Sequence, residues 1–218
     1  MKYLAIVPLF VQSLAFGQLT IEAAHDSAVL KYHIGTYSYH EEFIGHKGYG
    51  APLILTADGG GAAFGDGDEG TMLVKMDKTG KITWKKIIVP KGEEVESQSV
   101  VQDAAGNFYV CQLVYDHSKY RGGCERMICL SKTGAILWDK YIGSFTLLNN
   151  PTIAYMRTLS DGRIALRGQV VTKTPPQDKD PEYHFWEGWL NSKGVLTQKV
   201  GEVINWGNED WKKKFKPE

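Results

Sequence analysis

Three acidic side chains on a glycine-rich stretch are the first residues in this sequence that could do chemistry. Asp66, Asp68 and Glu69 lie close together between Gly65 and Gly70. Closely spaced carboxylates on a loop can supply the hard oxygen ligands that Ca²⁺ prefers. The spacing departs from the EF-hand template, because a glycine stands at the fifth position. A solvated acidic turn is therefore the favoured interpretation, and a calcium site is the alternative.

Aromatic residues near the C-terminal end form a second candidate, with Tyr183, Trp186 and Trp189 in one short run. Exposed aromatic rings could stack on sugars, so this run could bind a glycan. Trp186 and Trp189 are three residues apart and would face opposite sides of a β-strand. At least one of the two is expected in the core, and packing is the favoured interpretation of the run.

The cysteines are the third candidate. If the strands around Tyr120 form a hairpin, positions whose numbers sum to 240 oppose each other, and Cys111 and Cys129 satisfy this condition. Opposed residues in a non-hydrogen-bonded pair lie close enough for a disulfide. The sequence thus predicts a Cys111–Cys129 bridge with Cys124 left over, against the alternative of three reduced core thiols. The spacing CxxC is absent, which argues against zinc.

Linear signatures of common enzymes are missing from the sequence, including HExxH, GxSxG and GxxxxGK[ST]. Gly59, Gly60 and Gly61 follow one predicted strand and precede another, so a phosphate cradle would lack its helix N-terminus. A composite site needs no linear motif, however, so catalysis in a channel between repeats stays an alternative.

The elements that must position these residues come from an internal repeat. The phrase DKTGKITW at 77–84 recurs as SKTGAILW at 131–138 and, in degenerate form, as NSKGVLTQ at 191–198. An Asp/Asn–Gly turn also precedes each copy upstream, at 58–60, 103–107 and 160–163. Such turns between short apolar runs indicate hairpins. A period near 50 residues indicates stacked supersecondary units.

Each unit is predicted to hold four strands in a meander. Three full units follow a partial one, in which 28–34 and 41–45 resemble the last two strands of a unit. The fold class is therefore all-β, a β-propeller-like array of four-stranded meander blades. An open array or a fragment of a larger propeller remain as alternatives. Trp84 and Trp138 stand four residues after their turn glycines, so both are predicted to be buried between blades and to have no ligand role, whereas the third unit carries Gln198 there.

These phrases resemble the propeller-type repeats of exported bacterial surface proteins. The resemblance is carried by ADGGGAAFG at 57–65, LVKMDKTGKITWKK at 73–86 and DAAGNFYV at 103–110. The family repeats read DGGyivaG, then LvKlDxxGnixWxK. This likeness covers most of residues 40–200. It implies a β-propeller at the cell exterior of a bacterium and implies no particular reaction.

The N-terminus reads as a signal peptide at 1–17, ending in small residues at Ala15 and Gly17. The repeat domain is then assigned to 18–201 and a C-terminal strand or tail to 202–218. Lys+Arg and Asp+Glu both number 25, so the broad basic field that nucleic-acid binding needs is absent. No apolar run is long enough for a membrane span.

Taken together, the sequence predicts a secreted or periplasmic, non-enzymatic binding or scaffold module. Its expected partner is a protein or a glycan, and its only expected cofactor is the calcium considered above. The alternative function is a hydrolase- or lyase-type enzyme whose site lies in the propeller channel.

Overall fold

The protein is described by a computed structural model that covers residues 19–24, 27–34, 37–44, 53–67, 70–90, 95–115, 123–145, 148–173 and 180–205. For the strands before residue 53 it describes the backbone alone. All regular elements in these ranges are β-strands, and each pairs antiparallel with its neighbour. The all-β prediction is therefore confirmed.

The strands of the described residues form four meander sheets, here called sheet N and sheets 1, 2 and 3. Sheet N contains β1 (Leu19–Ala24), β2 (Ser27–Ile34) and β3 (Tyr37–Ile44). Sheet 1 contains β4 (Leu53–Leu55), β5 (Gly61–Gly67), β6 (Gly70–Met76) and β7 (Ile82–Pro90). Sheet 2 contains β8 (Val95–Gln102), β9 (Phe108–Tyr115), β10 (Gly123–Leu130) and β11 (Ile136–Ile142). Sheet 3 contains β12 (Thr152–Thr158), β13 (Ile164–Val171), β14 (Tyr183–Leu190) and β15 (Leu196–Val203).

Sheets 1, 2 and 3 are the three predicted four-stranded units. The partial unit is larger than predicted, because β1 pairs with β2 and adds a third strand to the expected two. The predicted signal peptide at 1–17 and the tail from residue 206 onward lie outside the described residues. None of the four sheets closes on itself within the described ranges.

The repeated turn phrase has the same structure in each sheet. Asp77, Ser131 and Asn191 each accept hydrogen bonds through a side-chain oxygen from the backbone N–H groups two and four residues later. The glycine three residues after each of them has a positive φ of 81°, 83° or 68°. A left-handed backbone favours glycine, so this phrase ends one strand and begins the next at a fixed offset.

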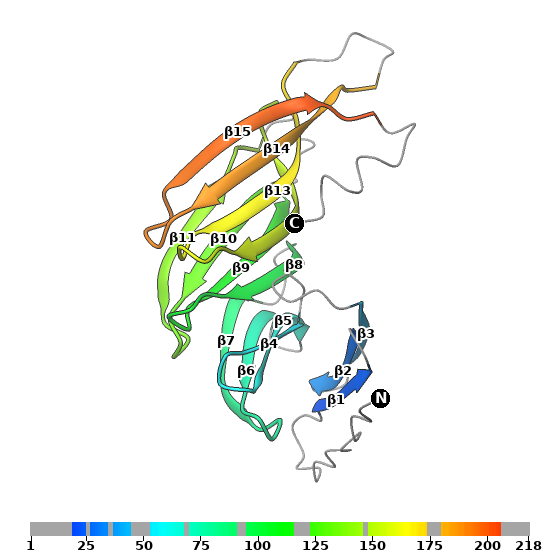
Figure 1. The fold of residues 1–218 in the computed structure, drawn as a ribbon, viewed down its shortest axis with the longest axis vertical. Coiled ribbons are helices and arrows are strands. Elements are labelled where there is room, and N and C mark those ends of the chain that lie inside the picture. The colour runs from blue at the N-terminus through cyan, green and yellow to red at the C-terminus, as the bar shows by residue number, and fades with distance from the viewer. Residues whose placement is uncertain are drawn as a thin grey trace, which may run out of the picture.

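The three four-stranded sheets stack face to face in a curved row (Figure 1). Their first strands lie near one another, β4 beside β8 and β8 beside β12. Their last strands, β7, β11 and β15, lie on the other side of the row (Figure 1). One apolar cluster joins sheets 1 and 2 and includes Phe64, Leu73, Phe108 and Ile128. A second joins sheets 2 and 3 and includes Met127, Met156 and Trp186.

Burial follows this stacking. Strand β6 is buried at every residue because its sheet is covered on both faces, whereas the outer strand β15 is exposed along nearly its whole length. A strand covered on both faces reads as a continuous apolar run, as 72–74 does. Equivalent strands of the repeat therefore carry different patterns of apolar and polar side chains, according to how many faces of their sheet are covered.

A tryptophan links each sheet to the next. The indole Nε1–H of Trp84 in β7 donates to the carbonyl oxygen of Lys132 at 3.1 Å. The indole Nε1–H of Trp138 in β11 donates to the carbonyl oxygen of Ser192 at 3.0 Å. Both acceptors lie in the turn phrase of the following sheet, two residues before its glycine. We call this pairing the tryptophan clasp.

Both indoles are half-buried, and each lies against the turn glycine of the next sheet. A Cβ on Gly134 would stand 3.1 Å from Trp84, and one on Gly194 would stand 2.9 Å from Trp138. The glycine thus has two functions, since its positive φ makes the turn and its missing side chain admits the ring. The two tryptophans pack at equivalent positions between sheets, as predicted, but both are half-buried where the sequence predicted full burial.

A β-bulge aims each clasp tryptophan at its neighbour. In sheet 1 the register shifts so that Trp84 lies opposite Lys75, and in sheet 2 the same shift puts Trp138 opposite Cys129. The extra residue reverses the alternation of the last strand, so that the indole faces the next sheet.

Sheet 3 lacks this bulge next to its turn. Thr197 lies opposite Trp189, and Gln198 lies opposite Gly188 on the other face. The Gln198 amide oxygen accepts a hydrogen bond from Trp186 Nε1 at 3.1 Å, within its own sheet. By its spacing from the turn glycine, Gln198 is equivalent in sequence to Trp84 and Trp138. The strand register nevertheless places its side chain on the face of sheet 3 that packs on sheet 2.

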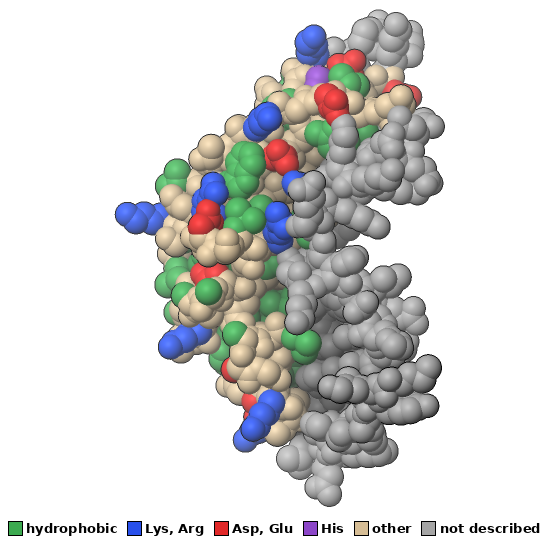
Figure 2. Space-filling model, viewed as in Figure 1, with side chains coloured by type: hydrophobic (Ala, Val, Ile, Leu, Met, Phe, Trp, Pro, Cys, Tyr) green, Lys and Arg blue, Asp and Glu red, His purple; other side chains and the backbone are tan. Residues whose placement is uncertain are grey.

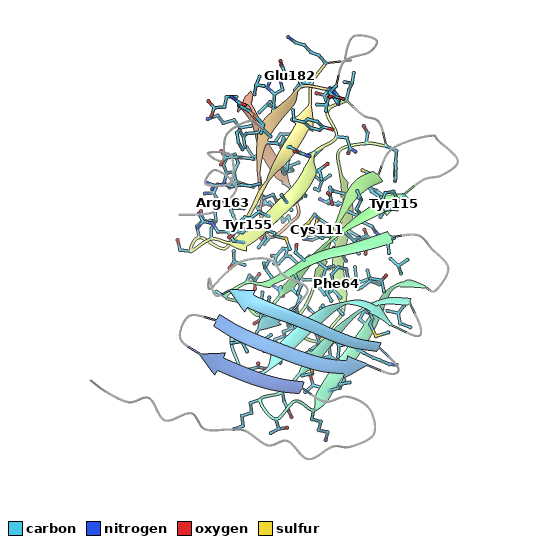
Figure 3. The ribbon with its side chains drawn as sticks, turned by 90° about the vertical axis from the view of Figure 1, so that its right-hand side faces the viewer. Phe64, Cys111, Tyr115, Tyr155, Arg163 and Glu182 are labelled. Atoms are coloured by element: carbon cyan, nitrogen blue, oxygen red, sulfur yellow. The ribbon has the colours of Figure 1, made fainter. Side chains whose placement is uncertain are left out.

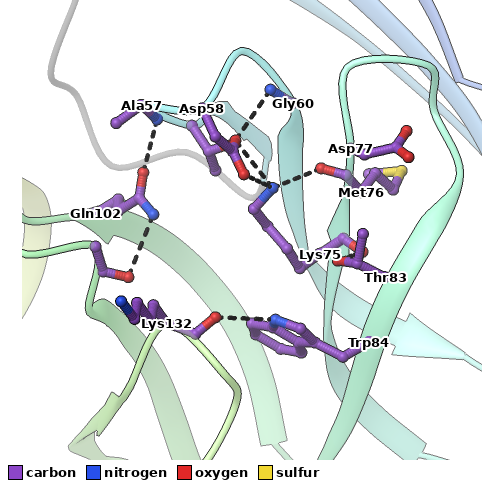
Figure 4. A network of polar contacts seen from close by, with 12 residues as sticks. Ala57, Asp58, Gly60, Lys75, Met76, Asp77, Thr83, Trp84, Gln102 and Lys132 are labelled. Atoms are coloured by element: carbon purple, nitrogen blue, oxygen red, sulfur yellow. Dashed lines mark hydrogen bonds and ion pairs between the residues drawn. The ribbon is translucent and has the colours of Figure 1, made fainter.

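A polar network surrounds the first clasp (Figure 4). Lys75, which is buried, donates from Nζ to both carboxylate oxygens of Asp58 at 3.1 and 2.9 Å and to the carbonyl oxygen of Met76 at 2.6 Å. Bonds from the Thr56 hydroxyl and from Lys75 lower the pKa of Asp58 to about 2. All the hydrogen-bonding capacity of this lysine is engaged, which gives it a structural role.

Two matched glycine variants test the clasp. Gly194→Ala and Gly162→Ala both place an alanine at positive φ, at 68° and 83°, but the space beyond Gly162 is open, whereas Trp138 covers Gly194. Both changes should cost roughly 1–2 kcal/mol of backbone strain. Gly194→Ala should cost a further 1–3 kcal/mol or so from overpacking. Urea denaturation measures the difference, and equal unfolding free energies would contradict the clasp.

Candidate functional site

Sheet 3 has one face on sheet 2 and one face that points away from it. Met156, Leu166, Trp186 and Leu190 belong to the first face and lie in the shared core. We call the opposite face the outward face. Strand register places on it Tyr155, Arg157, Ala165, Arg167, Gln169, Tyr183, Phe185, Glu187, Trp189, Thr197 and Lys199.

A row of polar side chains crosses the centre of the outward face. Tyr155, Arg167, Glu187 and Lys199 lie opposite one another on the four successive strands. Arg167 Nε and Glu187 Oε1 form an ion pair at 3.1 Å, with 27% and 36% of the two side chains exposed. An ion pair in this setting contributes about 0–1 kcal/mol to stability, so the fold does not depend on it.

The equivalent positions in the other sheets are apolar. Arg167 stands five residues after its turn glycine, as Cys111 does in sheet 2 and Phe64 does in sheet 1. Both equivalents are fully buried beneath the next sheet. Glu187 likewise takes the place of Met127 and Leu73, which are also fully buried. The ion pair thus replaces core residues at the point where the described stack ends.

An aromatic line runs along β14 on this face. Tyr183, Phe185 and Trp189 share the outward side, and each is half-buried. The line extends over seven residues of β14, from 183 to 189, or about 20 Å of strand. Trp186 faces the other way, is 2% exposed and lies in the core. Of the three aromatic residues singled out in the sequence, the structure therefore brings Tyr183 and Trp189 to one surface.

The sequence reasoning missed the charged members of the face. The signal was present in the repeat itself, because aligning the turn glycines sets Arg167 and Glu187 against apolar residues of the first two units. Tyr155 carries no comparable signal, since it reaches the face by a register shift in β12. It is labelled beside the sheet in Figure 3.

The predicted calcium ligands are not placed by the structure. Asp68 and Glu69 lie outside the described residues, and of Asp66 only the backbone, in β5, is described. Among the described residues, His, Cys, Asp and Glu side chains form no group of three or more with metal-binding geometry. The calcium site stays a prediction.

The cysteines do not have the register that the sequence reasoning assumed. Cys111 lies opposite Met127 and Cys129 lies opposite Tyr109, so opposed positions sum to 238 and not to 240. All three cysteines are free and buried, and the expected Cys111–Cys129 bridge is not formed. The register is shifted by two residues from the predicted one, which leaves the two thiols on the same face of the sheet but two rungs apart.

Each thiol is held in its neutral form by its surroundings. Burial and the nearby Glu125 carboxylate raise the pKa of Cys111 well above the ordinary value, and the Cys111 Sγ–H donates to Glu125 Oε2 at 3.4 Å. Burial raises the pKa of Cys124 and of Cys129 to about 11. Glu125 in turn accepts the Ile153 backbone N–H at 2.9 Å, which joins sheets 2 and 3. These groups have a packing role.

No protein-family model matches this chain, and no curated protein is similar to it. The part of the chain that the structure describes contains no helix with the length and hydrophobicity of a membrane span. Positive and negative side chains are interspersed over the face shown in Figure 2, without a large patch of one sign.

The thiol environment yields a labelling prediction. A thiol with a pKa near 11 is about one part in a thousand ionised at pH 8, and the thiolate is the nucleophile. Iodoacetamide should therefore leave Cys111, Cys124 and Cys129 unmodified in the folded protein at pH 8, and should label all three in urea. Mass spectrometry after a timed exposure provides the measurement. Rapid labelling of any one of them in the folded state would contradict the buried placement.

Proposed function

We propose that this chain is a non-enzymatic, exported binding module whose ligand lies on the outward face of sheet 3. The observation that carries the proposal is the exchange of core residues for the Arg167–Glu187 pair at equivalent positions of the repeat. A sheet face that carries this ion pair in place of core residues suits a partner other than a further sheet of the repeat. The aromatic line supplies the contact residues, because Trp, Tyr and Arg dominate the energetics of binding surfaces.

The scaffold in this proposal is a propeller-like fan that remains open at sheet 3. First strands that come together on one side, with last strands on the other, are what blades around an axis require (Figure 1). At the centre of its outer face sheet 3 carries the Arg167–Glu187 ion pair in place of core residues, and its last strand carries no clasp tryptophan for a following blade. This favours an open array over closure through sheet 3.

Rigidity supports a binding role for such a scaffold. The outward face lies on four paired strands whose other face is packed in a core that includes the buried Trp186. Side chains on regular strands are held more precisely than side chains on loops. A preformed face loses less conformational entropy when a ligand binds.

Export of the protein is part of the same proposal, because residues 1–17 read as a signal peptide.

A glycan array tests the binding function. The purified protein should bind at least one glycan class, and Trp189→Ala should abolish the signal because it removes the most polarisable ring of the outward face. Tyr141→Ala is the matched control, since Tyr141 is an exposed aromatic residue on β11, outside the face. Thr197→Arg, at an exposed position opposite Trp189, should block the face without opening a cavity.

Circular dichroism melts of all three variants separate lost binding from lost folding. Binding that survives both Trp189→Ala and Thr197→Arg in folded protein would contradict the proposed site. An array on which the wild-type protein binds nothing would contradict the proposed function.

A further inference from the structure

We infer that the turn phrase of sheet 1, residues 77–81, is a receptor for Trp211 of a second copy of this chain. The pairing extends the tryptophan clasp from one copy to the next. It goes beyond the proposed binding function and does not use the outward face of sheet 3. Three observations carry it: an acceptor turn without an indole, a third clasp sequence, and the distance between the two within one chain.

The turn of sheet 1 has the structure of the two turns that accept an indole. Gly80 has a φ of 81°, close to the 83° and 68° of the two glycines beneath the clasp indoles. The Gly80 N–H donates to the Asp77 carbonyl, and the Asp77 N–H donates to the Lys81 carbonyl, as their equivalents do in the other turns. The Lys78 carbonyl oxygen stands two residues before Gly80, which is the position from which the other turns accept the indole N–H. Sheet 1 therefore presents a preformed clasp acceptor.

No indole occupies this acceptor in the part of the chain that the structure describes. There the Lys78 carbonyl oxygen accepts no hydrogen bond, and Gly80 is partly exposed. Gly134 and Gly194, by contrast, are buried beneath their indoles. Sheet N precedes sheet 1 in the chain and contains no tryptophan, and the four tryptophans of sheets 1, 2 and 3 lie in the two clasps and in β14. An indole that docks on this turn therefore comes from residues 206–218 or from another molecule.

The clasp sequence occurs a third time, outside the described residues. A tryptophan, a lysine two residues later and an apolar residue four residues later occur together as WKKII at 84–88, WDKYI at 138–142 and WKKKF at 211–215. The lysine takes part in the second clasp, where Lys140 Nζ donates to the carbonyl oxygens of Lys193 and Gly194 at 3.0 Å. Trp206 has no lysine at the same spacing. Trp211 is therefore the third donor, and the turn of sheet 1 is the third acceptor.

Within one chain the donor is too far from the acceptor. Trp211 follows Asn205, the last described residue, by six positions, which span at most about 21 Å. Strand β15 starts beside the turn of sheet 3 and ends about 25 Å from it. The turn of sheet 1 lies on the turn side of the row, two sheet spacings or about 20 Å from the turn of sheet 3. The end of β15 and the strands β6 and β7 accordingly lie at opposite ends of the long axis (Figure 1). A second copy therefore supplies the indole.

This contact joins two different surfaces of the chain. Each copy that donates its tryptophan keeps its own acceptor, and each copy that accepts one keeps its own donor. Such heterologous contacts lead to rings where the rotation closes and to open chains where it does not. The copies are thus expected to associate beyond the dimer.

Analytical ultracentrifugation over a range of protein concentrations tests the inference. The average mass of the native protein should rise with concentration through dimers to larger species. Trp211→Ala should remain monomeric at the concentration at which half of the native protein is associated. Trp206→Ala is the matched control and should associate as the native protein does. A native protein that stays monomeric at every concentration would overturn the inference, as would association of Trp211→Ala to the native extent.

Two glycine variants of sheet 1 test the acceptor. Gly80→Ala adds a methyl group where the indole lies in the other two turns, so association should be lost. Gly59→Ala places an alanine at nearly the same φ, 80° against 81°, with open space beyond it, and should associate normally. The backbone strain is the same in both variants, so it does not explain a difference between them. Equal association of the two variants would overturn the assignment of the acceptor.

Mixing the two deficient variants separates lost association from lost folding. Trp211→Ala keeps the acceptor and Gly80→Ala keeps the donor, so an equimolar mixture should form a one-to-one dimer and nothing larger. Each variant alone should stay monomeric at the same total concentration. A mixture that also stays monomeric would overturn the pairing of Trp211 with the turn of sheet 1.

Discussion

The hydrogen bond from each clasp indole to the turn of the next sheet is the interaction on which the stack depends. A four-stranded meander has two faces and can cover neither alone, so each sheet needs a neighbour at a defined position. Trp84 and Trp138 supply that position through their last strands, where each indole packs against an apolar cluster and bonds to the turn of the next sheet. The acceptor, the turn glycine and the bulge that aims the ring must all be present together. Each tryptophan therefore depends on a turn about 50 residues farther along the chain.

Sheet 3 lies at the end of the described stack and makes no clasp to a further sheet among the described residues. It keeps the turn phrase but lacks the adjacent bulge, and Gln198 bonds to Trp186 within its own sheet. Charged residues then occupy positions that are core elsewhere. Terminal units of repeat proteins commonly carry a polar outer face for this reason. A binding surface can form there without weakening the core.

Much of the fold could be predicted from the sequence because glycine turns are local signals. The turns around Gly80, Gly134 and Gly194 fix where strands end, and these ends determine the sheets. Register is different, because a shift of one residue reverses a strand's faces without changing its composition. That is why the bulges were missed, and a shift of two residues is why the Cys111–Cys129 bridge was predicted wrongly. The spacing of Trp186 and Trp189 did predict that they lie on opposite faces, because side chains alternate along a single strand. The residues beside the aromatic line lie on other strands, so they could not be identified without the register between strands.

Hydrogen exchange of the indole N–H groups tests the central claim most directly. In the native protein, the Nε1–H signals of Trp84 and Trp138 can be followed by two-dimensional NMR after transfer to deuterated water. Because each is half-buried and donates to a backbone carbonyl of the next sheet, both should be protected to the same extent as amides in the central strands β6 and β10. Exchange of either indole at the rate of the unfolded chain would show that the sheets stack without the clasp.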